Sequence, residues 1–306
     1  SIMHLVFDHI RSRCIITTIR NKDGSIRITT PTHTPLTYYQ QVLSPIFSAH
    51  IFNTHKSKFV QFLLFYVCSL PTLASASLPP KSLAEPNKLV LDDGAIYREF
   101  CTNFLSTILD QFQPPIARQC SACYLSSFIS RAKYVNTATA AEVVSALLQY
   151  AELYIHAHAN VGANGTQTNL LCELDKADML TQHGVYYAVT QGAFYIMCFR
   201  GIEIHHWYQS HKAEYPQFNF HPQRWVDIGW NASKLNLHPF RYCFGPVKRE
   251  FLHLMEDLYG LNEEEFVPPG HTCYMQPPMD EKIKKELIKK ELVKKEGVDA
   301  TTTKSA

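Results

Sequence analysis

Glycine and tryptophan are scarce in this sequence, with 12 and three residues among 306. Sandwiches and barrels rich in turns need more glycine, whereas abundant Leu, Ala, Phe and Tyr favour helices. An excess of charge of either sign is also absent, because 29 Lys and Arg stand against 27 Asp and Glu, for a formal net charge of +2. The overall charge therefore does not indicate a nucleic-acid binder. Hydrophobic residues make up 46% of the chain, which suffices for a substantial core.

The sequence also lacks the short motifs that carry common reaction chemistries. It has no G-x-S-x-G, no P-loop, no kinase signature set and no Rossmann glycine pattern. The loop at residues 160–169 has too few glycines to cradle a phosphate. Since no reaction centre is recognisable, we expect a binding protein that is not an enzyme and that uses no cofactor.

A hydrophobic run long enough to cross a bilayer is missing as well. The run from Phe59 to Leu70 is shorter than the roughly 20 residues that a membrane span needs. Lys56 before it and Ala74-Ser-Ala76 after it give it the look of a secretory signal, but it lies in mid-chain. We expect a buried helix and no membrane segment. A secreted or membrane-anchored helical protein, cleaved after Ala76 and glycosylated at Asn164 or Asn231, is the alternative.

Cysteine is present in an odd number, which favours free thiols in a reducing compartment over a disulfide framework. The nine are Cys14, Cys68, Cys101, Cys120, Cys123, Cys172, Cys198, Cys243 and Cys273. Cys120-x-x-Cys123 has no second pair at zinc-site spacing, so it predicts packed core cysteines on a helix. His205, His206 and His211 lack carboxylates at a metallohydrolase spacing and are expected on the surface. A zinc-binding regulatory protein is the alternative hypothesis.

Patterning divides the chain into three parts. Residues 1–35 show no sustained helical period and form an ill-defined lead-in. Residues 36–262 form a helical repeat domain with irregular loops at about 71–92 and 158–175. Residues 263–306 are a charged tail with a repeated Lys-Lys-Glu unit, which we expect to be solvated and flexible.

The most regular hydrophobic stripe runs from Ile96 to Phe112, with Asp92-Asp93 as candidate caps. A second helix is expected from Pro115 to about Val135, because proline suits a first helical turn. A third begins at Thr139, where Thr139 and Glu142 make a capping box. Three amphipathic helices with short connectors predict an antiparallel stack.

The C-terminal half of the domain continues this pattern around an aromatic segment. Met179 to Phe199 carries almost no charge and predicts a helix enclosed on most sides. Residues from Trp207 to Trp230 look irregular, and a last helix is expected from Phe240 to Leu261, ending at Gly260.

Three cations on the Pro115–Val135 helix are the candidate partner-binding residues. On an ideal helix Arg131 projects beside Cys120, within the apolar stripe, so its charge needs an internal partner or an interface. Arg118 and Lys133 lie on another side, close to each other in rotation. They are candidates for contact with acidic protein or phosphate, and a solvated pair is the alternative.

Three segments, in order along the chain, resemble the RNA polymerase I-specific transcription initiation factor family. The first contains Thr54-His55, Val60-Gln61-Phe62 and Phe65 to Ser69; the second Arg118-Gln119, Tyr124, Ser127-Phe128 and Arg131 to Val135; the third His183-Gly184, Tyr186-Tyr187, Gln191, Phe194-Tyr195 and Phe199-Arg200. The resemblance covers about Leu36 to Leu261 and is that of a central to C-terminal piece. Residues 1–33 have no evident counterpart.

The resemblance implies an all-α, HEAT-repeat-like α-solenoid of stacked antiparallel helix pairs. It implies a nuclear, nucleolar protein that binds RNA polymerase I and bridges it to promoter-bound core initiation factors at ribosomal RNA genes. Arg118, Arg131 and Lys133 would then contact a partner. Weak DNA contact and self-association are further hypotheses, and a generic helical-repeat scaffold is the alternative.

Overall fold

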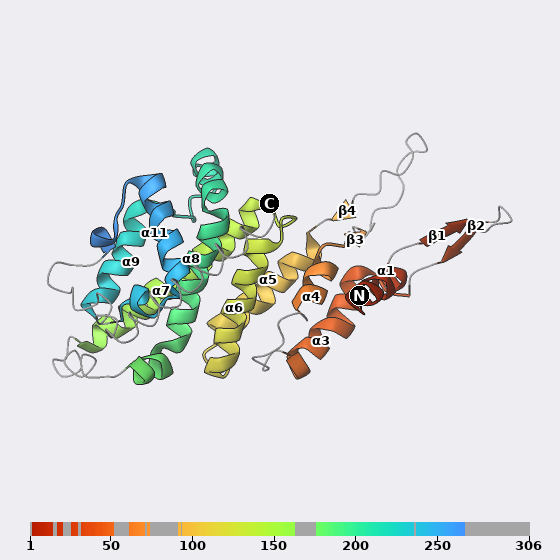
Figure 1. The fold of residues 1–306 in the computed structure, drawn as a ribbon, viewed down its shortest axis with the longest axis horizontal. Helices are drawn as coiled ribbons and strands as arrows, with labels where there is room; N and C mark the ends of the chain where they lie inside the picture. The colour runs from red at the N-terminus through yellow and green to blue at the C-terminus, as the bar shows by residue number, and fades with distance from the viewer. Residues whose placement is uncertain are drawn as a thin grey trace, which may run out of the picture.

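The computed structural model describes residues 2–14, 17–20, 26–29, 32–51, 61–70, 72–73, 91–92, 94–162, 176–235 and 237–266. This part of the chain is mainly helical, as predicted. The helices form an elongated row, with α1 near one end and α9 and α11 at the other (Figure 1). The short strands pair only locally, β1 with β2 and β3 with β4.

The N-terminal elements are short, and two of them, η1 and η2, are π-helical rather than α-helical. They are α1 (Ile2–Cys14), β1 (Thr17–Arg20), β2 (Ile26–Thr29), α2 (Pro35–Tyr38), η1 (Tyr39–Leu43), α3 (Ser44–Ile46), η2 (Phe47–Ile51), α4 (Gln61–Cys68), β3 (Thr72–Leu73) and β4 (Leu91–Asp92). Strands β1 and β2 are antiparallel, with Thr17 opposite Thr29. No helix was expected where α1 lies, yet α1 buries Ile10 and Cys14.

The remaining helices are longer and form the packed body of the molecule. They are α5 (Ala95–Leu109), α6 (Pro115–Arg131), α7 (Thr137–Gly162), α8 (Lys176–His211), α9 (Pro222–Lys234), α10 (Pro239–Tyr242) and α11 (Gly245–Tyr259), followed by the 3-10 turn η3 (Glu263–Phe266). Phe266 is buried against Phe240 and Phe251, so this core reaches the last described residue.

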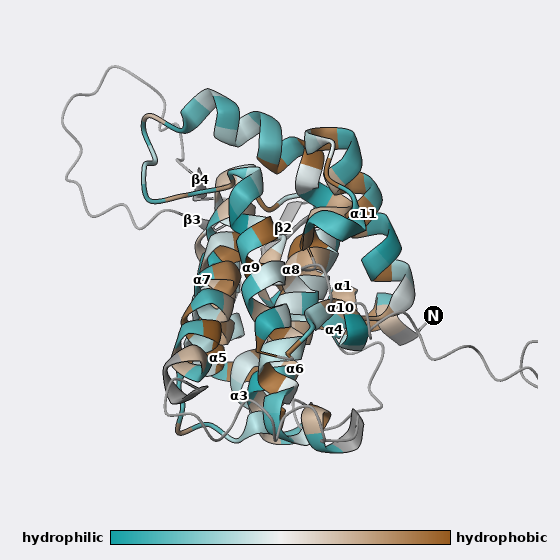
Figure 2. Ribbon diagram, turned by 90° about the vertical axis from the view of Figure 1, so that its left-hand side faces the viewer, coloured by the Kyte–Doolittle hydropathy of each residue, from teal (hydrophilic) through white to brown (hydrophobic). Residues whose placement is uncertain are grey.

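Helix α8 lies at the centre, in contact with α6, α7, α10 and α11. Gly184 of α8 lies against Gln119 of α6, and Gly192, two turns later, lies against Ser126, which is also two turns later. The two helices therefore run parallel. Small residues at these points let the backbones approach closely, and the hydrophobic faces of the helices turn inward (Figure 2).

Two layers result from these contacts. One contains α6, α8 and α11, and the other contains α5, α7 and α9. Two contacts join α8 to α11 within the first layer. Leu254 of α11 fills the space where a Cβ on Gly201 of α8 would stand, and Cys198 of α8 lies beside the Val247 carbonyl of α11. The enclosed helix predicted from Met179 to Phe199 is thus confirmed as the middle of a layer.

The predicted starts of α5 and α7 were wrong, as were the predicted ends of α5 and of α6, which stops at Arg131 and not near Val135. Helix α5 has Gly94 at its N-cap, not Asp92 or Asp93, and it ends at Leu109. Phe112 lies beyond that end and is 98% exposed, although it continues the apolar spacing. The capping box at Thr139 is not formed, because Asn136 Oδ1 accepts the Thr139 N–H at 2.8 Å and α7 begins at Thr137.

The segment from Trp207 to Trp230, expected to be irregular, is helical at both ends. Helix α8 continues to His211, whose ring stacks on Trp207 one turn earlier. Helix α9 begins at Pro222 and is capped by His221, whose Nδ1 accepts the Gln223 N–H. The aromatic and histidine side chains of this segment pack against helices and cap them, so they do not mark a loop.

The last predicted helix is confirmed, with an interruption before Pro246. It consists of α10 and α11, and it ends as expected at Gly260, whose φ of 68° suits a residue without a side chain. The apolar run after residue 60 is also a buried helix, α4, which buries Leu64 and Val67. Among the described helices, none is both long and apolar enough to span a membrane.

Candidate partner-binding surface

Arg118 is half-buried near the start of α6 and is held within the chain. Its Nε–H donates to the Ile108 carbonyl at 2.8 Å, and an Nη–H donates to the Tyr150 hydroxyl at 3.2 Å. The guanidinium also lies over the Tyr150 ring, 5.6 Å from its centroid. Arg118 therefore ties the end of α5 to α7.

Arg131 lies at the other end of α6 and is exposed. Arg131 and Cys120 share one side of α6, as predicted, but other helices cover that side only partly. The prediction that Arg131 is buried within the apolar stripe was therefore wrong. Its guanidinium donates to Ser127 Oγ at 2.7 Å and to the Tyr195 hydroxyl at 2.9 Å. Hydroxyl groups orient the cation without neutralising its charge.

Lys133 is exposed and follows the end of α6 instead of lying on it. Arg118 and Lys133 therefore do not share one side of a helix, as the sequence suggested. About 13 residues of helix at 1.5 Å each, roughly 20 Å, separate Arg118 from Arg131. The exposed pair of cations is Arg131 with Lys133, at the junction of α6 and α7.

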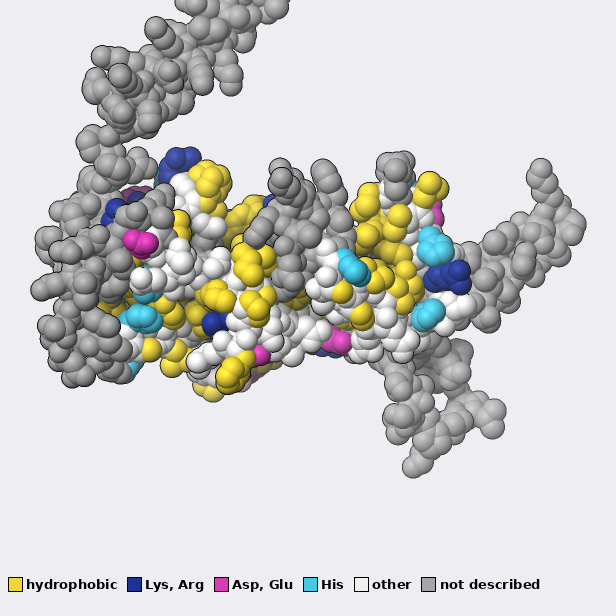
Figure 3. Space-filling view, turned by 90° about the horizontal axis from the view of Figure 1, so that it is seen from below, with side chains coloured by type: hydrophobic (Ala, Val, Ile, Leu, Met, Phe, Trp, Pro, Cys, Tyr) yellow, Lys and Arg dark blue, Asp and Glu magenta, His cyan; other side chains and the backbone are white. Residues whose placement is uncertain are grey.

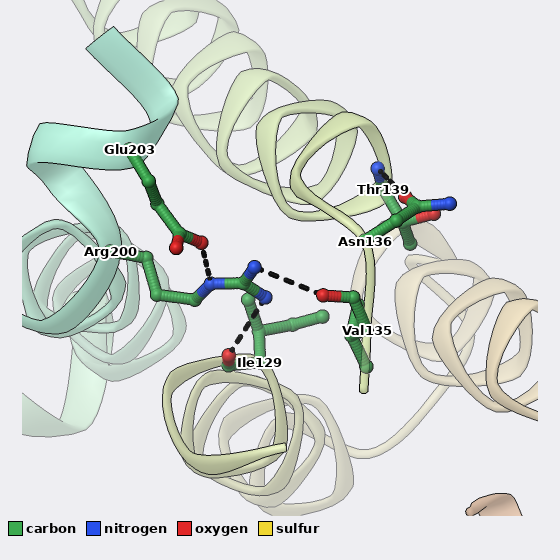
Figure 4. Close-up of polar contacts among 6 residues, drawn as sticks. All are labelled: Ile129, Val135, Asn136, Thr139, Arg200 and Glu203. Carbon is green, nitrogen blue, oxygen red and sulfur yellow. Dashed lines mark hydrogen bonds and ion pairs between the residues drawn. The ribbon is translucent and has the colours of Figure 1, made fainter. Parts of the chain in front are cut away.

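The deeply buried cation is Arg200 of α8, which is 9% exposed. Its guanidinium donates to the carbonyls of Ile129 at 3.5 Å and Val135 at 3.0 Å and pairs with Glu203 (Figure 4). Ile129 lies in the last turn of α6, where carbonyls lack partners within the helix. Arg200 therefore caps α6 and ties it to α8. An isolated cation after an uncharged aromatic run was the sequence signal for it.

A polar contact also joins α7 to α8 in the interior. The Tyr154 hydroxyl and His183 Nδ1 are 2.7 Å apart, and His158 Nδ1 lies 2.8 Å from the Tyr154 carbonyl. His183 is 4% exposed. Burial, with a smaller contribution from His158, lowers the pKa of His183 to about 4. His183 is therefore neutral near pH 7 and serves as a fixed hydrogen-bonding group.

The cysteine and histidine candidates do not converge. Cys123 is exposed and Cys120 is half-buried, so the prediction of core cysteines was wrong for Cys123. His205 Nδ1 contacts the Tyr259 hydroxyl at 3.0 Å, while His221 caps α9. Among the described residues, no three His, Cys, Asp or Glu side chains are placed to hold a metal ion. Cys172 and Cys273 lie outside those residues.

Seen from below, hydrophobic side chains are exposed in patches along the length of the molecule, with few charged groups among them (Figure 3). Large exposed apolar residues are found on several helices. They include Leu109, Phe112, Ile116, Phe199, Ile202 and Phe244. Exposed apolar groups beside uncompensated cations are features of a protein-binding surface.

The fold and these surfaces define a layered helical protein with features suited to recognition. The family model described as "RNA polymerase I specific transcription initiation factor RRN3" matches residues 1–78 and 92–259. The chain therefore belongs to this family. The match includes residues 1–33, so the prediction that they lack a family counterpart was wrong. The internal gap in this match, residues 79–91, falls in the predicted loop at about 71–92.

Two curated relatives carry the same family name. The RNA polymerase I-specific transcription initiation factor rrn3 of Schizosaccharomyces pombe is 25% identical over 213 residues, which are 68% of this chain and 28% of the relative. RRN3 of Mus musculus is 27% identical over 165 residues, 53% of this chain and 19% of the relative. The chain thus aligns with less than a third of either relative. No solved structure matches it significantly.

Proposed function

We propose that this chain acts in RNA polymerase I initiation by binding the polymerase. The family match over most of the chain is the observation that carries the proposal. A binding role agrees with the exposed apolar and cationic groups, because initiation factors act through recognition and not through catalysis. The relatives are between about two and three times as long as this chain, which would supply part of the binding surface that they carry.

Binding to purified RNA polymerase I, measured by biolayer interferometry, tests this proposal directly. We expect the 306-residue chain to bind and to compete with the S. pombe relative for the polymerase. The same measurement with RNA polymerase II is the control for specificity. If the relative binds and this chain does not at micromolar concentration, the proposal is wrong.

We propose further that the helices form a HEAT-repeat-like α-solenoid of stacked antiparallel pairs. The pairs would be α5 with α6, α7 with α8, and α9 with α11. Two observations support this arrangement. Helices α6 and α8 run parallel, and an ion pair between Arg224 and Glu152 joins α9 to α7. Such arrays create extended surfaces for large partners. Small-angle X-ray scattering that reported a compact sphere would contradict this arrangement.

Arg131 and Lys133 are the exposed contact cations in this proposal. Charge reversal of both residues is expected to weaken polymerase binding. Lys212→Glu, which reverses another exposed lysine, is the matched control. Arg118 is proposed to contribute mainly through its internal bonds, so Arg118→Glu should lower stability together with binding. Unchanged binding by the Arg131/Lys133 variant would remove both residues from the interface.

Bridging to promoter-bound core factors and a nucleolar location complete the proposal. A pull-down with immobilised core factors should retain the polymerase only when the bridging protein is present. A fluorescent fusion should coincide with RNA polymerase I in the nucleus. Weak DNA contact and self-association are smaller parts of the proposal, to be tested by gel shift and by analytical ultracentrifugation.

A further inference from the structure

The outward side of α8 carries an apolar stripe of which only Tyr195 packs against the core. Tyr195, Phe199 and Ile202 are spaced i, i+4 and i+7, which places them on one face of the helix. Phe199 is 58% and Ile202 59% exposed, although Met197 and Ile204 on the same helix are almost completely buried. The Tyr195 and Phe199 rings lie 4.9 Å apart. We call Tyr195, Phe199 and Ile202 the α8 stripe.

Arg131 borders the α8 stripe on the side of α6. The Tyr195 hydroxyl accepts a hydrogen bond from Arg131, so the guanidinium is fixed at the edge of the stripe. The Arg131 guanidinium also lies 6.0 Å from the centroid of the Tyr195 ring. Lys133 is exposed two residues further along the chain. Neither the hydroxyl of Ser127 nor that of Tyr195 offsets the charge of Arg131.

Carboxylates near the α8 stripe do not cancel this charge. Glu203 is paired with Arg200, whose own charge it offsets. Glu250 of α11 lies near Cys198, where its charge helps to raise the pKa of that thiol, and Arg249 beside it on α11 is an exposed cation. The charge of Arg131 at the edge of the stripe therefore favours a ligand that carries carboxylates next to its apolar side chains.

We propose that the α8 stripe binds a short segment of RNA polymerase I in which aromatic or aliphatic side chains adjoin Asp or Glu. The apolar side chains cover Phe199 and Ile202, while the carboxylates face Arg131 and Lys133. Burial of the stripe supplies affinity, and the bordering cations fix the orientation and raise the association rate. This inference rests on the proposed function and adds to it the site on this chain and the kind of segment bound.

Photo-crosslinking tests the chemistry of the bound segment. With p-benzoylphenylalanine in place of Phe199, irradiation of the complex with purified polymerase should crosslink a segment that contains Asp or Glu beside apolar residues. A crosslink only to a basic or uncharged segment would overturn the proposal. So would a crosslink to residues 267–306 of the same chain, because the stripe would then be covered from within.

Point variants test the site. Ile202→Glu and Arg131→Glu should each weaken binding at least about tenfold, the effect of losing one well-placed contact, and Arg131→Lys should restore part of it by keeping the charge. Leu153→Glu is the matched control, because Leu153 is 63% exposed on α7, in the other layer. Circular dichroism and urea unfolding confirm that each variant is folded.

The two proposals fail in different ways. If the unmodified chain does not bind the polymerase, the proposed function is refuted, and this inference with it. If the chain binds and Ile202→Glu binds equally well, the α8 stripe is refuted while the proposed function stands. Equal loss in Ile202→Glu and Leu153→Glu would also refute the stripe, because any exposed carboxylate would then suffice.

Discussion

Helix α8 meets α6 in two regions that differ in kind. The inner region is closed by glycine contacts and by Arg200, whose charge is paired with Glu203 and whose remaining donors meet carbonyls. The outer region contains Arg131, whose donors meet only hydroxyls, beside exposed Phe199. Two arginines thus bridge the same helices. The inner arginine therefore serves stability, whereas the outer one keeps its charge available for a partner.

The largest effect is expected from Arg200→Ala, which opens the inner region. The substitution leaves the Val135 and Ile129 carbonyls without their donor and removes the partner of Glu203. Buried acceptors without donors cost roughly 1–3 kcal/mol each. We expect the free energy of unfolding to fall by about 3 kcal/mol, measured by urea denaturation.

Glu203→Gln is the control for the Arg200 substitution. The Glu203 side chain is 48% exposed, and its amide replacement can still accept a hydrogen bond from Arg200. The expected loss is below about 1 kcal/mol, as for other exposed ion pairs. Equal losses in the two variants would mean that the ion pair, and not the capping of α6, is what Arg200 contributes.

Acid should destabilise the chain through His183, on the inner side of α8 that faces α7. Folding lowers the pKa of His183 from its ordinary value of 6.5 to about 4, so between these values the unfolded chain binds a proton that the folded chain does not. Stability is therefore full above pH 7 and falls as the pH drops from 6.5 towards 4. The loss is roughly 1–3 kcal/mol, from about 1.36 kcal/mol per pKa unit, with allowance for relaxation.

His183→Gln separates this contribution from that of other histidines. Thermal melts of the two proteins between about pH 4 and 8 give the difference profile. We expect the difference in stability to change across that acidic window and to be constant above about pH 7. A difference that does not vary with pH would show that His183 titrates normally in the folded chain.

Gly192→Val should disturb the same inner region to a smaller extent. A Cβ at residue 192 would stand 2.4 Å from Ser126 Oγ and 3.5 Å from the Ala122 carbonyl. Overpacking of this kind costs typically about 1–3 kcal/mol, and we expect about 2 kcal/mol by urea denaturation. Ser126→Ala in the same chain should recover part of the loss, whereas additive losses would place the strain elsewhere.

The sequence predicted the helical class, the enclosed aromatic helix and the end at Gly260 because each depends on local pattern or on one residue's conformational freedom. It did not predict how far helices extend, since Asn136, His211 and His221 act through contacts one turn away. Nor did it separate Arg131 from Arg200. Rotation about an ideal helix gives the direction of a side chain, but whether a second helix covers that side depends on tertiary packing.

The smallest effect is expected in the outer region, from Ile202→Glu. Because Ile202 is 59% exposed, little packing is lost on substitution, and the free energy of unfolding should change by no more than about 0.5 kcal/mol. Urea unfolding of Ile202→Glu beside Arg200→Ala compares the two regions within one helix. A loss above about 2 kcal/mol in Ile202→Glu would show that the outer face is part of the core, and the contrast between a structural and a binding side of α8 would fail.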